Sequence, residues 1–342
     1  MKVIFFCQNP YAFGILAPIM KVLKKKGYDY IWFVGPKIDS FPFDNEPYTT
    51  EIKRLRDFKS DAIYVPGNEV PHYLRGVKTQ VFHGLAGEKK GHFRIRHYFD
   101  LYLTQGPYFT NKFNELKRKY NNFEVIETGW PKLDIFGENK DEYKNLKEDL
   151  LKKYKVKKII LYAPTFSPSL TSAPYLTHEI KSLASEGDYL VICKFHDLMS
   201  PDLIKTYENI AKGNDKIIYE NERNITKFLI ISDILISDTS SVVYEFLLLD
   251  KPVLTFKNNN EKIFWDDAKV YTKLIERVKA NLGKDIFRDQ RKYIMDNYHP
   301  YSDGKSGERM VEAVEDYIQK FGIPEKRKLS IYRKLKIKKI FG

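Results

Sequence analysis

The sequence has only two cysteines, Cys7 and Cys193, and both lie in apolar runs. This usage is typical of buried thiols in a reducing compartment and excludes a disulfide framework. No stretch approaches the roughly 18 apolar residues of a spanning helix, and no Asp-x-Asp pair or cysteine cluster predicts a metal site. The start, MKVIFFCQNP, predicts a first strand rather than a signal peptide. We therefore expect a cytoplasmic protein, soluble or peripheral to a membrane.

The chain contains enough apolar side chains for large folded domains. It has 342 residues, of which 43% are hydrophobic and 15% aromatic, and this length suggests two domains. Predicted strands and helices alternate almost throughout, which favours an α/β fold with parallel sheets covered by helices. A densely charged segment at residues 138–155 indicates an exposed helix between two halves. We predict domains at residues 1–140 and 141–322, followed by a basic tail at residues 323–342.

Acidic residues are absent from residues 326–339, which hold eight lysines and arginines in a chain of net charge +13. Apolar side chains alternate with these charges at roughly helical spacing: Leu329, Tyr332, Leu335, Ile340 and Phe341. A short helix of this kind can lie on an anionic membrane, with each basic residue contributing about 1 kcal/mol. A disordered solvated tail and a nucleic-acid-binding arm fit the same composition. We favour the membrane surface and give nucleic acid the least weight.

Residues 233–256 predict a strand, a polar elbow, a helix and a second strand. The elbow consists of Asp238, Thr239, Ser240 and Ser241. Hydroxyl groups and backbone N–H groups at a helix start stabilise an anion such as phosphate. In the alternative interpretation, Asp238, Thr239 or Ser240 simply caps the helix, which contributes about 1 kcal/mol. Taken alone, the pattern favours capping.

Two other polar loops follow predicted strands, at the edge where open parallel sheets bind ligands. His83 precedes Gly84, so no neighbouring side chain shields the imidazole, and a histidine titrating near neutrality suits a general base. Lys194 and His196 alternate at strand spacing and could bind phosphate oxygens as a cation pair. Structural roles compete with both interpretations. They are a buried, hydrogen-bonded histidine at His83, a structural histidine at His196 and an ordinary surface lysine at Lys194.

A late polar loop, YSDGKSGER, contains Asp303, Gly304 and Arg309 and leads into a predicted helix. Helix capping by Asp303 and a surface role for Arg309 are the interpretations that this pattern favours by itself.

Six blocks of the sequence, in this order, resemble those of the CDP-glycerol glycerophosphotransferase family: VFHGLAGEKKGHF, TGWPKLDIF, LYAPTF, VICKFH, LISDTSSVVYEFLLLDKPV and YSDGKSGERMVEAV. The resemblance covers roughly residues 77–315. Enzymes of this family build wall teichoic acids and related capsular polymers. The resemblance implies a GT-B fold, in which two Rossmann-like domains with parallel sheets face each other across an interdomain cleft. The first domain would serve the acceptor and the second the nucleotide donor.

The resemblance also implies roles for individual residues. His83 matches a catalytic base, and His196 a histidine that binds the donor diphosphate and stabilises its developing charge. The positions implied at the donor phosphates are Lys194, Asp238, Thr239, Ser240 and Ser241. Further possible donor or acceptor contacts are Gly84, Thr165, Asp303, Gly304 and Arg309. Family members usually have proline at the position of Asp197 and commonly tyrosine at that of Thr239, so the identity of the donor stays open.

The implied reaction transfers glycerol phosphate from CDP-glycerol, a substrate and not a cofactor, to a hydroxyl of a lipid-linked saccharide or polymer, releasing CMP. We expect no metal or other cofactor, and we expect the enzyme at the inner face of the cell membrane. A related polyol phosphate, such as ribitol phosphate, is an open alternative. A GT-B glycosyltransferase or epimerase acting on a UDP-sugar is a second alternative, and a non-enzymatic membrane-surface or nucleic-acid-binding module is a third.

Overall fold

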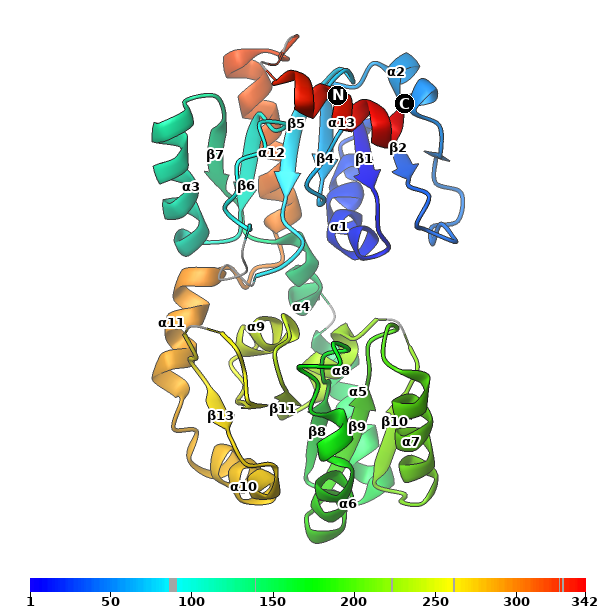
Figure 1. The fold of residues 1–342 in the computed structure, drawn as a ribbon, viewed down its shortest axis with the longest axis vertical. Coiled ribbons are helices and arrows are strands. Elements are labelled where there is room, and N and C mark those ends of the chain that lie inside the picture. The colour runs from blue at the N-terminus through cyan, green and yellow to red at the C-terminus, as the bar shows by residue number, and fades with distance from the viewer. Residues whose placement is uncertain (86–90, 139, 223, 261, 326, 328) are drawn as a thin grey trace. The chain divides into compact units, whose positions relative to one another are not determined.

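The computed structural model describes residues 1–85, 91–138, 140–222, 224–260, 262–325, 327 and 329–342. The chain divides into two compact units: unit 1 combines Met1–Glu138 with Asn297–Gly342, and unit 2 is Asn139–Asp296. Each unit is a parallel sheet with helices packed against it (Figure 1), as an α/β fold predicts. The structure places the later boundary differently from the prediction, because residues 297–322 return to unit 1 instead of completing the second domain.

The sheet of unit 1 has seven strands among the described residues, in the order β3-β2-β1-β4-β5-β6-β7. The strands are β1 (Lys2–Cys7), β2 (Asp29–Val34), β3 (Tyr48–Thr49), β4 (Ala62–Val65), β5 (Val77–Val81), β6 (Leu101–Thr104) and β7 (Glu124–Glu127). The strand order reverses between β1 and β4. In open α/β sheets, ligands bind outside the carboxyl ends of the strands at such a reversal, and the loop after β5 starts at this edge.

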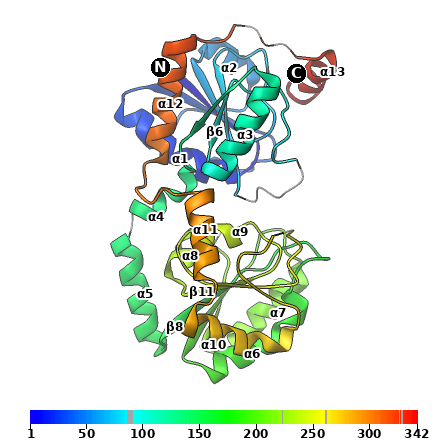
Figure 2. The same ribbon diagram turned by 90° about the vertical axis from the view of Figure 1, so that its left-hand side faces the viewer.

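The helices of unit 1 are α1 (Tyr11–Lys25), α2 (Ile52–Phe58), α3 (Pro107–Tyr120), α4 (Ile135–Glu138), α12 (Ser306–Phe321) and α13 (Ile331–Phe341). Helices α1 and α12 lie together on one side of the sheet and α13 on the other (Figure 2). Gly307 permits the contact between α1 and α12, since a Cβ there would lie 3.1 Å from the carbonyl oxygen of Pro18. This packing is why residues 297–322 belong to unit 1.

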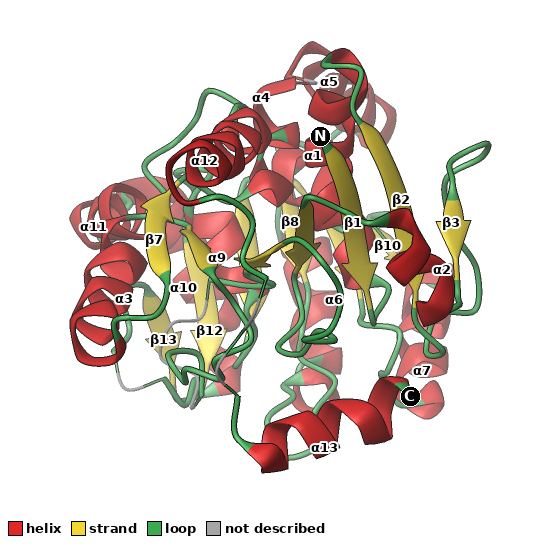
Figure 3. Ribbon diagram, turned by 90° about the horizontal axis from the view of Figure 1, so that it is seen from above, coloured by secondary structure: helices red, strands yellow, loops and turns green. Residues whose placement is uncertain are grey.

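Helix α13 completes the hydrophobic core of unit 1. The β4–β5 and β5–β6 connections contain no helix among their described residues, and α13 lies along the face of the sheet that they leave uncovered (Figure 3). Ile337 is fully buried and packs in one cluster with Ile4 and Phe6 of β1. The ring of Phe341 contacts that of Phe6, with 5.4 Å between the centroids. The basic tail is therefore a docked helix and not a solvated extension.

A buried ion pair leads into this docked helix. The Arg327 side chain is only 8% exposed and pairs with Asp100, itself 10% exposed. Arg327 Nε donates to Asp100 Oδ1 at 2.9 Å and Nη2 to the carbonyl oxygen of Gly76 at 3.0 Å. The backbone N–H of Lys78 donates to the same carboxylate at 2.7 Å. The start of the tail is thus held at the amino ends of β5 and β6.

Unit 2 has a six-stranded parallel sheet among its described residues, in the order β10-β9-β8-β11-β12-β13. The strands are β8 (Lys158–Tyr162), β9 (Tyr189–Lys194), β10 (Ile217–Glu220), β11 (Ile234–Ser237), β12 (Val253–Phe256) and β13 (Asp266–Ala268). The helices are α5 (Lys140–Tyr154), α6 (Thr177–Glu186), α7 (Pro201–Lys212), α8 (Thr226–Ile231), α9 (Val242–Leu247) and α10 (Leu274–Lys284), and α11 (Arg288–Tyr298) begins in this unit and runs past its boundary at Asp296. The strand order reverses between β8 and β11, so the polar loops that follow these two strands begin beside each other.

The first helix differs from its predicted bounds. The sequence predicts a loop from Gln8 to Gly14 and a helix from Ile15, whereas α1 begins at Tyr11 and contains both Gly14 and Pro18. Pro10 at the N-cap has φ −58° and ψ −31°, values that already suit a helix. Burial of one face of α1 in the core outweighs the costs of about 1 kcal/mol for an internal glycine and about 3 kcal/mol for an internal proline.

Candidate functional site

Two side chains from neighbouring segments hold the backbone around His83. The loop that carries this histidine follows β5 at the carboxyl edge of the unit 1 sheet. Trp130 Nε1 donates to the carbonyl oxygen of Phe82 at 2.6 Å, and Gln105 Nε2 donates to that of Gly84 at 2.9 Å. The position of His83 is therefore fixed from both sides, as a site requires if a reacting group must be held ready.

The side chain of His83 is exposed and held in a defined tautomer. Its Nδ1 lies 3.0 Å from the carbonyl oxygen of Pro66. A carbonyl oxygen can only accept, so Nδ1 carries a proton, and in the neutral ring Nε2 carries the lone pair. The Tyr11 ring lies beside the imidazole, 5.3 Å away between centroids. An exposed histidine with its basic nitrogen set in this way has the form of a general base.

The second histidine of this loop has a different environment. The ring of His92 stacks on Phe82 at 5.2 Å and contacts Phe109 at 5.3 Å, measured between centroids. Burial lowers the pKa of His92 to about 4, so it is neutral near pH 7 and packs as an aromatic side chain. Residues 86–90, which contribute the lysines of this loop, lie outside the described residues.

Gly84 and Gly304 are glycines for different reasons. At Gly84, no described neighbour lies within 4 Å of the place a Cβ would occupy. As far as the described residues go, the space beside it is open, as the predicted ligand contact requires. Gly304 has φ +70°, and a Cβ there would lie 3.2 Å from the carbonyl oxygen of Asp134, so the turn itself requires glycine.

Asp303 and Arg309 lie in unit 1, not with the donor-side residues. Arg309 Nη1 donates to Asp303 Oδ2 at 2.7 Å, and Arg309 Nε donates to the carbonyl oxygen of Thr128 at 2.8 Å. The guanidinium also stacks on the Tyr301 ring at 4.1 Å. These contacts attach the entry of α12 to the end of β7. A contact of Asp303 or Arg309 with the donor or the acceptor stays a prediction.

In unit 2, Asp238 connects the elbow to the loop after β8. Its Oδ1 accepts from the backbone N–H of Thr165 at 2.7 Å, and its Oδ2 accepts from the N–H and hydroxyl of Ser172 at 2.8 and 2.9 Å. Burial raises the pKa of Asp238 to about 6, and these three donated hydrogen bonds oppose the rise. With both oxygens engaged, the carboxylate shapes the loop that begins at Thr165. Its predicted role at the donor phosphates remains untested.

The elbow itself is not closed by a side-chain cap. Ser241 occupies the N-cap of α9 without a side-chain hydrogen bond to the helix. The Thr239 hydroxyl accepts from the N–H of Asn259 at 3.1 Å, which joins the elbow to the loop after β12. Helix α9 ends at Leu247, earlier than the predicted apolar run, and a helix this short has a weaker dipole. The hydroxyls of Ser240 and Ser241 stay candidate phosphate ligands.

Lys194 and His196 lie at the carboxyl end of β9. Lys194 is only 6% exposed, its ammonium donates to the carbonyl oxygen of Phe195, and burial lowers its pKa. His196 is exposed, and its Nδ1 accepts from the backbone N–H of Leu198 at 3.1 Å. Desolvation lowers the pKa of His196, the charge of Asp197 opposes this, and the charge of Lys194 adds to the lowering. Because Nδ1 accepts the bond from Leu198, the ring is neutral in this arrangement and its proton is on Nε2.

The loop after β8 links His196 to the elbow. The ring of Phe166 packs on the His196 imidazole at 4.6 Å between centroids, and the preceding residue, Thr165, is bound to Asp238. Unit 2 thus brings together predicted residues from three separate loops: Thr165, Lys194, His196 and the elbow. Unit 1 carries the others: His83, Gly84, Asp303, Gly304 and Arg309.

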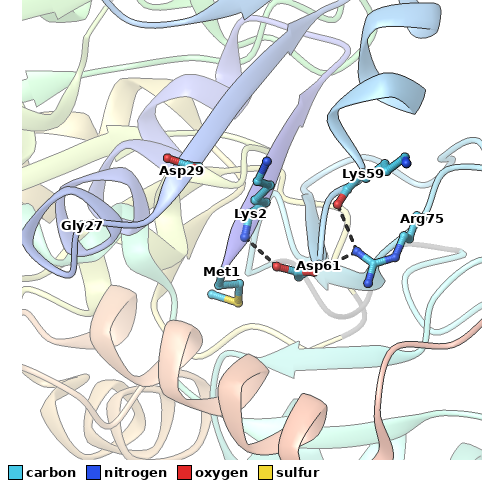
Figure 4. Close-up of a pocket in the computed structure, with 7 residues that line it drawn as sticks. All are labelled: Met1, Lys2, Gly27, Asp29, Lys59, Asp61 and Arg75. Carbon is cyan, nitrogen blue, oxygen red and sulfur yellow. Dashed lines mark hydrogen bonds and ion pairs between the residues drawn. The ribbon is translucent and has the colours of Figure 1, made fainter.

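A pocket of about 630 Å³ lies at the opposite, amino end of the unit 1 sheet (Figure 4). It is lined by Met1, Lys2, Gly27, Asp29, Lys59, Asp61 and Arg75. The Asp61 carboxylate accepts from the N–H of Lys2 and from Arg75, both at 2.8 Å. These charges compensate each other, and we assign no ligand to this pocket.

The supporting residues Gln105 and Trp130 are missing from the sequence-based list. A signal existed for Gln105, since a glutamine directly after a buried strand must find hydrogen-bond partners. The sequence alone does not show which backbone groups those partners are. Within the described residues, no cluster of three or more His, Cys, Asp or Glu is placed to hold a metal ion. No helix in the same part of the chain has the length and apolar character needed to cross a membrane.

A model of the CDP-glycerol:poly(glycerophosphate) glycerophosphotransferase family matches residues 76–316. Among curated relatives, the teichoic acid ribitol-phosphate polymerase TarL of Staphylococcus aureus is 27% identical over 71% of this chain and 46% of its own length. A teichoic acid poly(glycerol phosphate) polymerase of Bacillus spizizenii is 24% identical over 79% of this chain and 68% of its own. The chain spans about half the length of the first curated relatives it matches.

Solved structures with a similar fold include those of two different proteins. The wall teichoic acid polymerase TagF superposes with a TM-score of 0.66 at 17% identity, covering 93% of this chain and 89% of that chain. A co-structure of Staphylococcus aureus MnaA with UDP has a TM-score of 0.68 at 17% identity and covers 93% and 97%. At such identities the likeness concerns the fold alone, and it confirms the predicted GT-B type.

Proposed function

Because the chain belongs to the CDP-glycerol:poly(glycerophosphate) glycerophosphotransferase family, we propose that it transfers glycerol phosphate, or a related polyol phosphate, from its CDP-activated form. The acceptor is a hydroxyl of a lipid-linked saccharide or polymer in cell-surface polymer synthesis, and CMP is released. The observation that carries this proposal is a pair of exposed histidines that the backbone holds in opposite tautomers. His83 has its basic nitrogen at Nε2, whereas His196 has its proton at Nε2.

In the proposed reaction, Nε2 of His83 takes the proton of the acceptor hydroxyl. The hydroxyl oxygen then forms a bond to the phosphorus nearer the polyol, and the bond from that phosphorus to the oxygen of CMP breaks. The electron pair leaves with CMP. A general base of this kind contributes about 10²- to 10⁴-fold in rate.

The donor-side residues stabilise charge on the phosphates. The Nε2–H of His196 donates to a phosphate oxygen, and the ammonium of Lys194 adds a positive charge in a buried position, where electrostatic interactions are strong. The hydroxyls of Ser240 and Ser241 supply further donors. The removal of one such preorganised donor typically costs about 10²- to 10³-fold in rate.

A ligand panel identifies the donor class. CDP-glycerol, CDP-ribitol and CMP are expected to raise the melting temperature, whereas UDP-sugars and GDP-sugars leave it unchanged. A ligand that binds only the folded state at 100 times its Kd stabilises by about 2.7 kcal/mol. Lys194→Met is expected to abolish the response to CDP-glycerol, and Lys212→Met, the same change at an exposed position of α7, is expected to keep it. A response to UDP-sugars alone would favour the epimerase or glycosyltransferase alternative instead.

We further propose that the enzyme works at the inner face of the cell membrane and attaches through the outer face of α13. On this helix Ile331 is 76% exposed, Tyr332 75% and Leu335 61%, and Lys334, Lys338 and Lys339 are exposed beside them. Apolar side chains surrounded by lysines match an anionic lipid surface. The opposite side of α13 already packs on the core of unit 1. The helix is therefore folded before it meets the membrane and presents its outer face.

Vesicle binding tests this surface. Ile331→Ser combined with Tyr332→Ser is expected to weaken sedimentation with phosphatidylglycerol vesicles about tenfold or more, since two large apolar side chains lose their burial. The matched control is Ile286→Ser with Tyr175→Ser, which removes the same residue types at positions 60% and 59% exposed in unit 2. Equal binding by both double variants would contradict the assignment to α13. Deletion of the tail is unsuitable because it would uncover the core of unit 1.

A further inference from the structure

Gln80 lies near the His83 loop. It restrains the Pro66 carbonyl, and this carbonyl orients the His83 ring. The glutamine is on β5, is 4% exposed and pairs in register with Val65 at the end of β4. Its Nε2 donates to the carbonyl oxygen of Val65 at 3.0 Å and to that of Gly67 at 2.8 Å, and it lies 3.5 Å from that of Pro66. One amide group therefore holds the carbonyls on both sides of Pro66.

Pro66 itself adds a second restraint. The pyrrolidine ring fixes its φ, and Gln80 Nε2 contacts the carbonyl oxygens of Val65, Pro66 and Gly67, which restrains the segment that presents the Pro66 carbonyl. That carbonyl accepts from Nδ1 of His83 at 3.0 Å. In a neutral imidazole, the hydrogen bond made by one nitrogen decides whether the other carries the lone pair. Gln80 thus acts on His83 through a single intervening carbonyl.

We infer that Gln80 is a positioning residue for the general base: it fixes His83 in the Nδ1–H tautomer and directs Nε2 as the proton acceptor. This inference rests on the proposed function for its catalytic meaning. Trp130 and Gln105 hold the main chain at Phe82 and Gly84, so the path of the loop does not depend on Gln80. Loss of the glutamine amide therefore affects the ring and its tautomer more than the backbone.

The alternative is that Gln80 only satisfies buried carbonyl groups. Both interpretations predict a loss of stability when the amide is removed, because buried carbonyls lose their donors. Only the positioning role predicts a change in the tautomer of His83 and a fall in kcat without a change in KM for the donor, since the proposed donor-binding residues are in unit 2.

The experiment uses the full chain with ¹⁵N-labelled histidine, and the His83 signals are identified by their absence in His83→Gln. In the unmodified protein near neutral pH, His83 is expected to carry its proton on Nδ1. Gln80→Met is expected to shift the ring toward the Nε2–H tautomer and to lower kcat about 10- to 100-fold, by analogy with the loss of a group that orients a metal-bound histidine. KM for CDP-glycerol is expected to change by less than about twofold. Gln319→Met, on the exposed side of α12, is the matched control.

A proton on Nε2 of His83 in the unmodified protein would overturn the inference. So would a folded Gln80→Met protein with unchanged tautomer and kcat. Should Gln80→Met not fold, Pro66→Ala keeps the carbonyl but releases φ, and the same tautomer shift with a smaller fall in kcat is expected. An unchanged tautomer in Pro66→Ala would then count against the inference. Absence of turnover with every CDP-polyol would defeat the proposed function, while the tautomer measurement still decides the role of Gln80.

Discussion

His83→Gln is expected to lower kcat for polyol-phosphate transfer by about 10²- to 10⁴-fold, because the amide of glutamine cannot accept a proton from the attacking hydroxyl. Glutamine fills a similar volume and can still donate to the Pro66 carbonyl, the partner of His83 Nδ1 at 3.0 Å. The loop should therefore keep its shape, and the change isolates proton transfer. The measurement is steady-state release of CMP over a range of donor concentrations.

Two controls separate chemistry from folding and binding. His178→Gln makes the same substitution at an exposed position of α6 and is expected to leave kcat unchanged. The melting-temperature response of His83→Gln to CDP-glycerol should also persist, because the proposed donor-binding residues are in unit 2. Turnover of His83→Gln within about threefold of the unmodified protein would exclude His83 as the base, since a lost general base costs much more.

Arg327→Met is expected to cost about 3–5 kcal/mol in the free energy of unfolding, the range for removing one partner of a buried ion pair. The change leaves the Asp100 carboxylate buried without its cationic partner, while the Lys78 N–H still donates to it. It also removes the hydrogen bond to the Gly76 carbonyl and the fixed point before α13. Chemical denaturation gives the free energy, and hydrogen exchange of residues 329–342 should show loss of protection.

The matched control is Arg118→Met on the exposed side of α3, which should change stability by less than about 0.5 kcal/mol, as surface substitutions usually do. Combining Asp100→Asn with Arg327→Met should recover part of the loss, because no unpaired charge then remains buried. A cost below about 1 kcal/mol for Arg327→Met alone, as for an exposed ion pair, would mean that the tail is not held by this contact.

The candidate residues of the sequence analysis were found because they follow predicted strands. His83, Lys194 and the elbow come directly after apolar runs, and parallel sheets place the ends of such runs at one edge. Local pattern was enough for these positions. It was not enough for Asp303 and Arg309, which the sequence order placed with the second domain. Their ion pair and the bond from Arg309 to Thr128 attach them to unit 1, and such contacts between distant segments leave no local pattern.

The packing of the basic tail also could not be predicted from the local sequence. Its composition correctly indicated a basic, amphipathic helix, but the sequence could not tell which apolar side chains face inward. Leu329, Ile337 and Phe341 pack on the core of unit 1, whereas Ile331, Tyr332 and Leu335 are exposed. The choice depends on which face of the sheet lacks a crossover helix, a property of the assembled unit.

By itself, the sequence determined the alternation of strands and helices, the parallel sheets, and the loops that carry His83, His196 and the elbow. The hydrophobic periodicity of the chain, and the glycine and proline residues between its elements, encode these features locally. Only the tertiary structure decided that residues 297–342 return to unit 1, that Asp238 holds the loop of Thr165, and which nitrogen of each histidine carries the proton. These properties depend on hydrogen bonds between residues distant in the chain, and such partners are chosen only when the whole fold brings their backbone groups within reach.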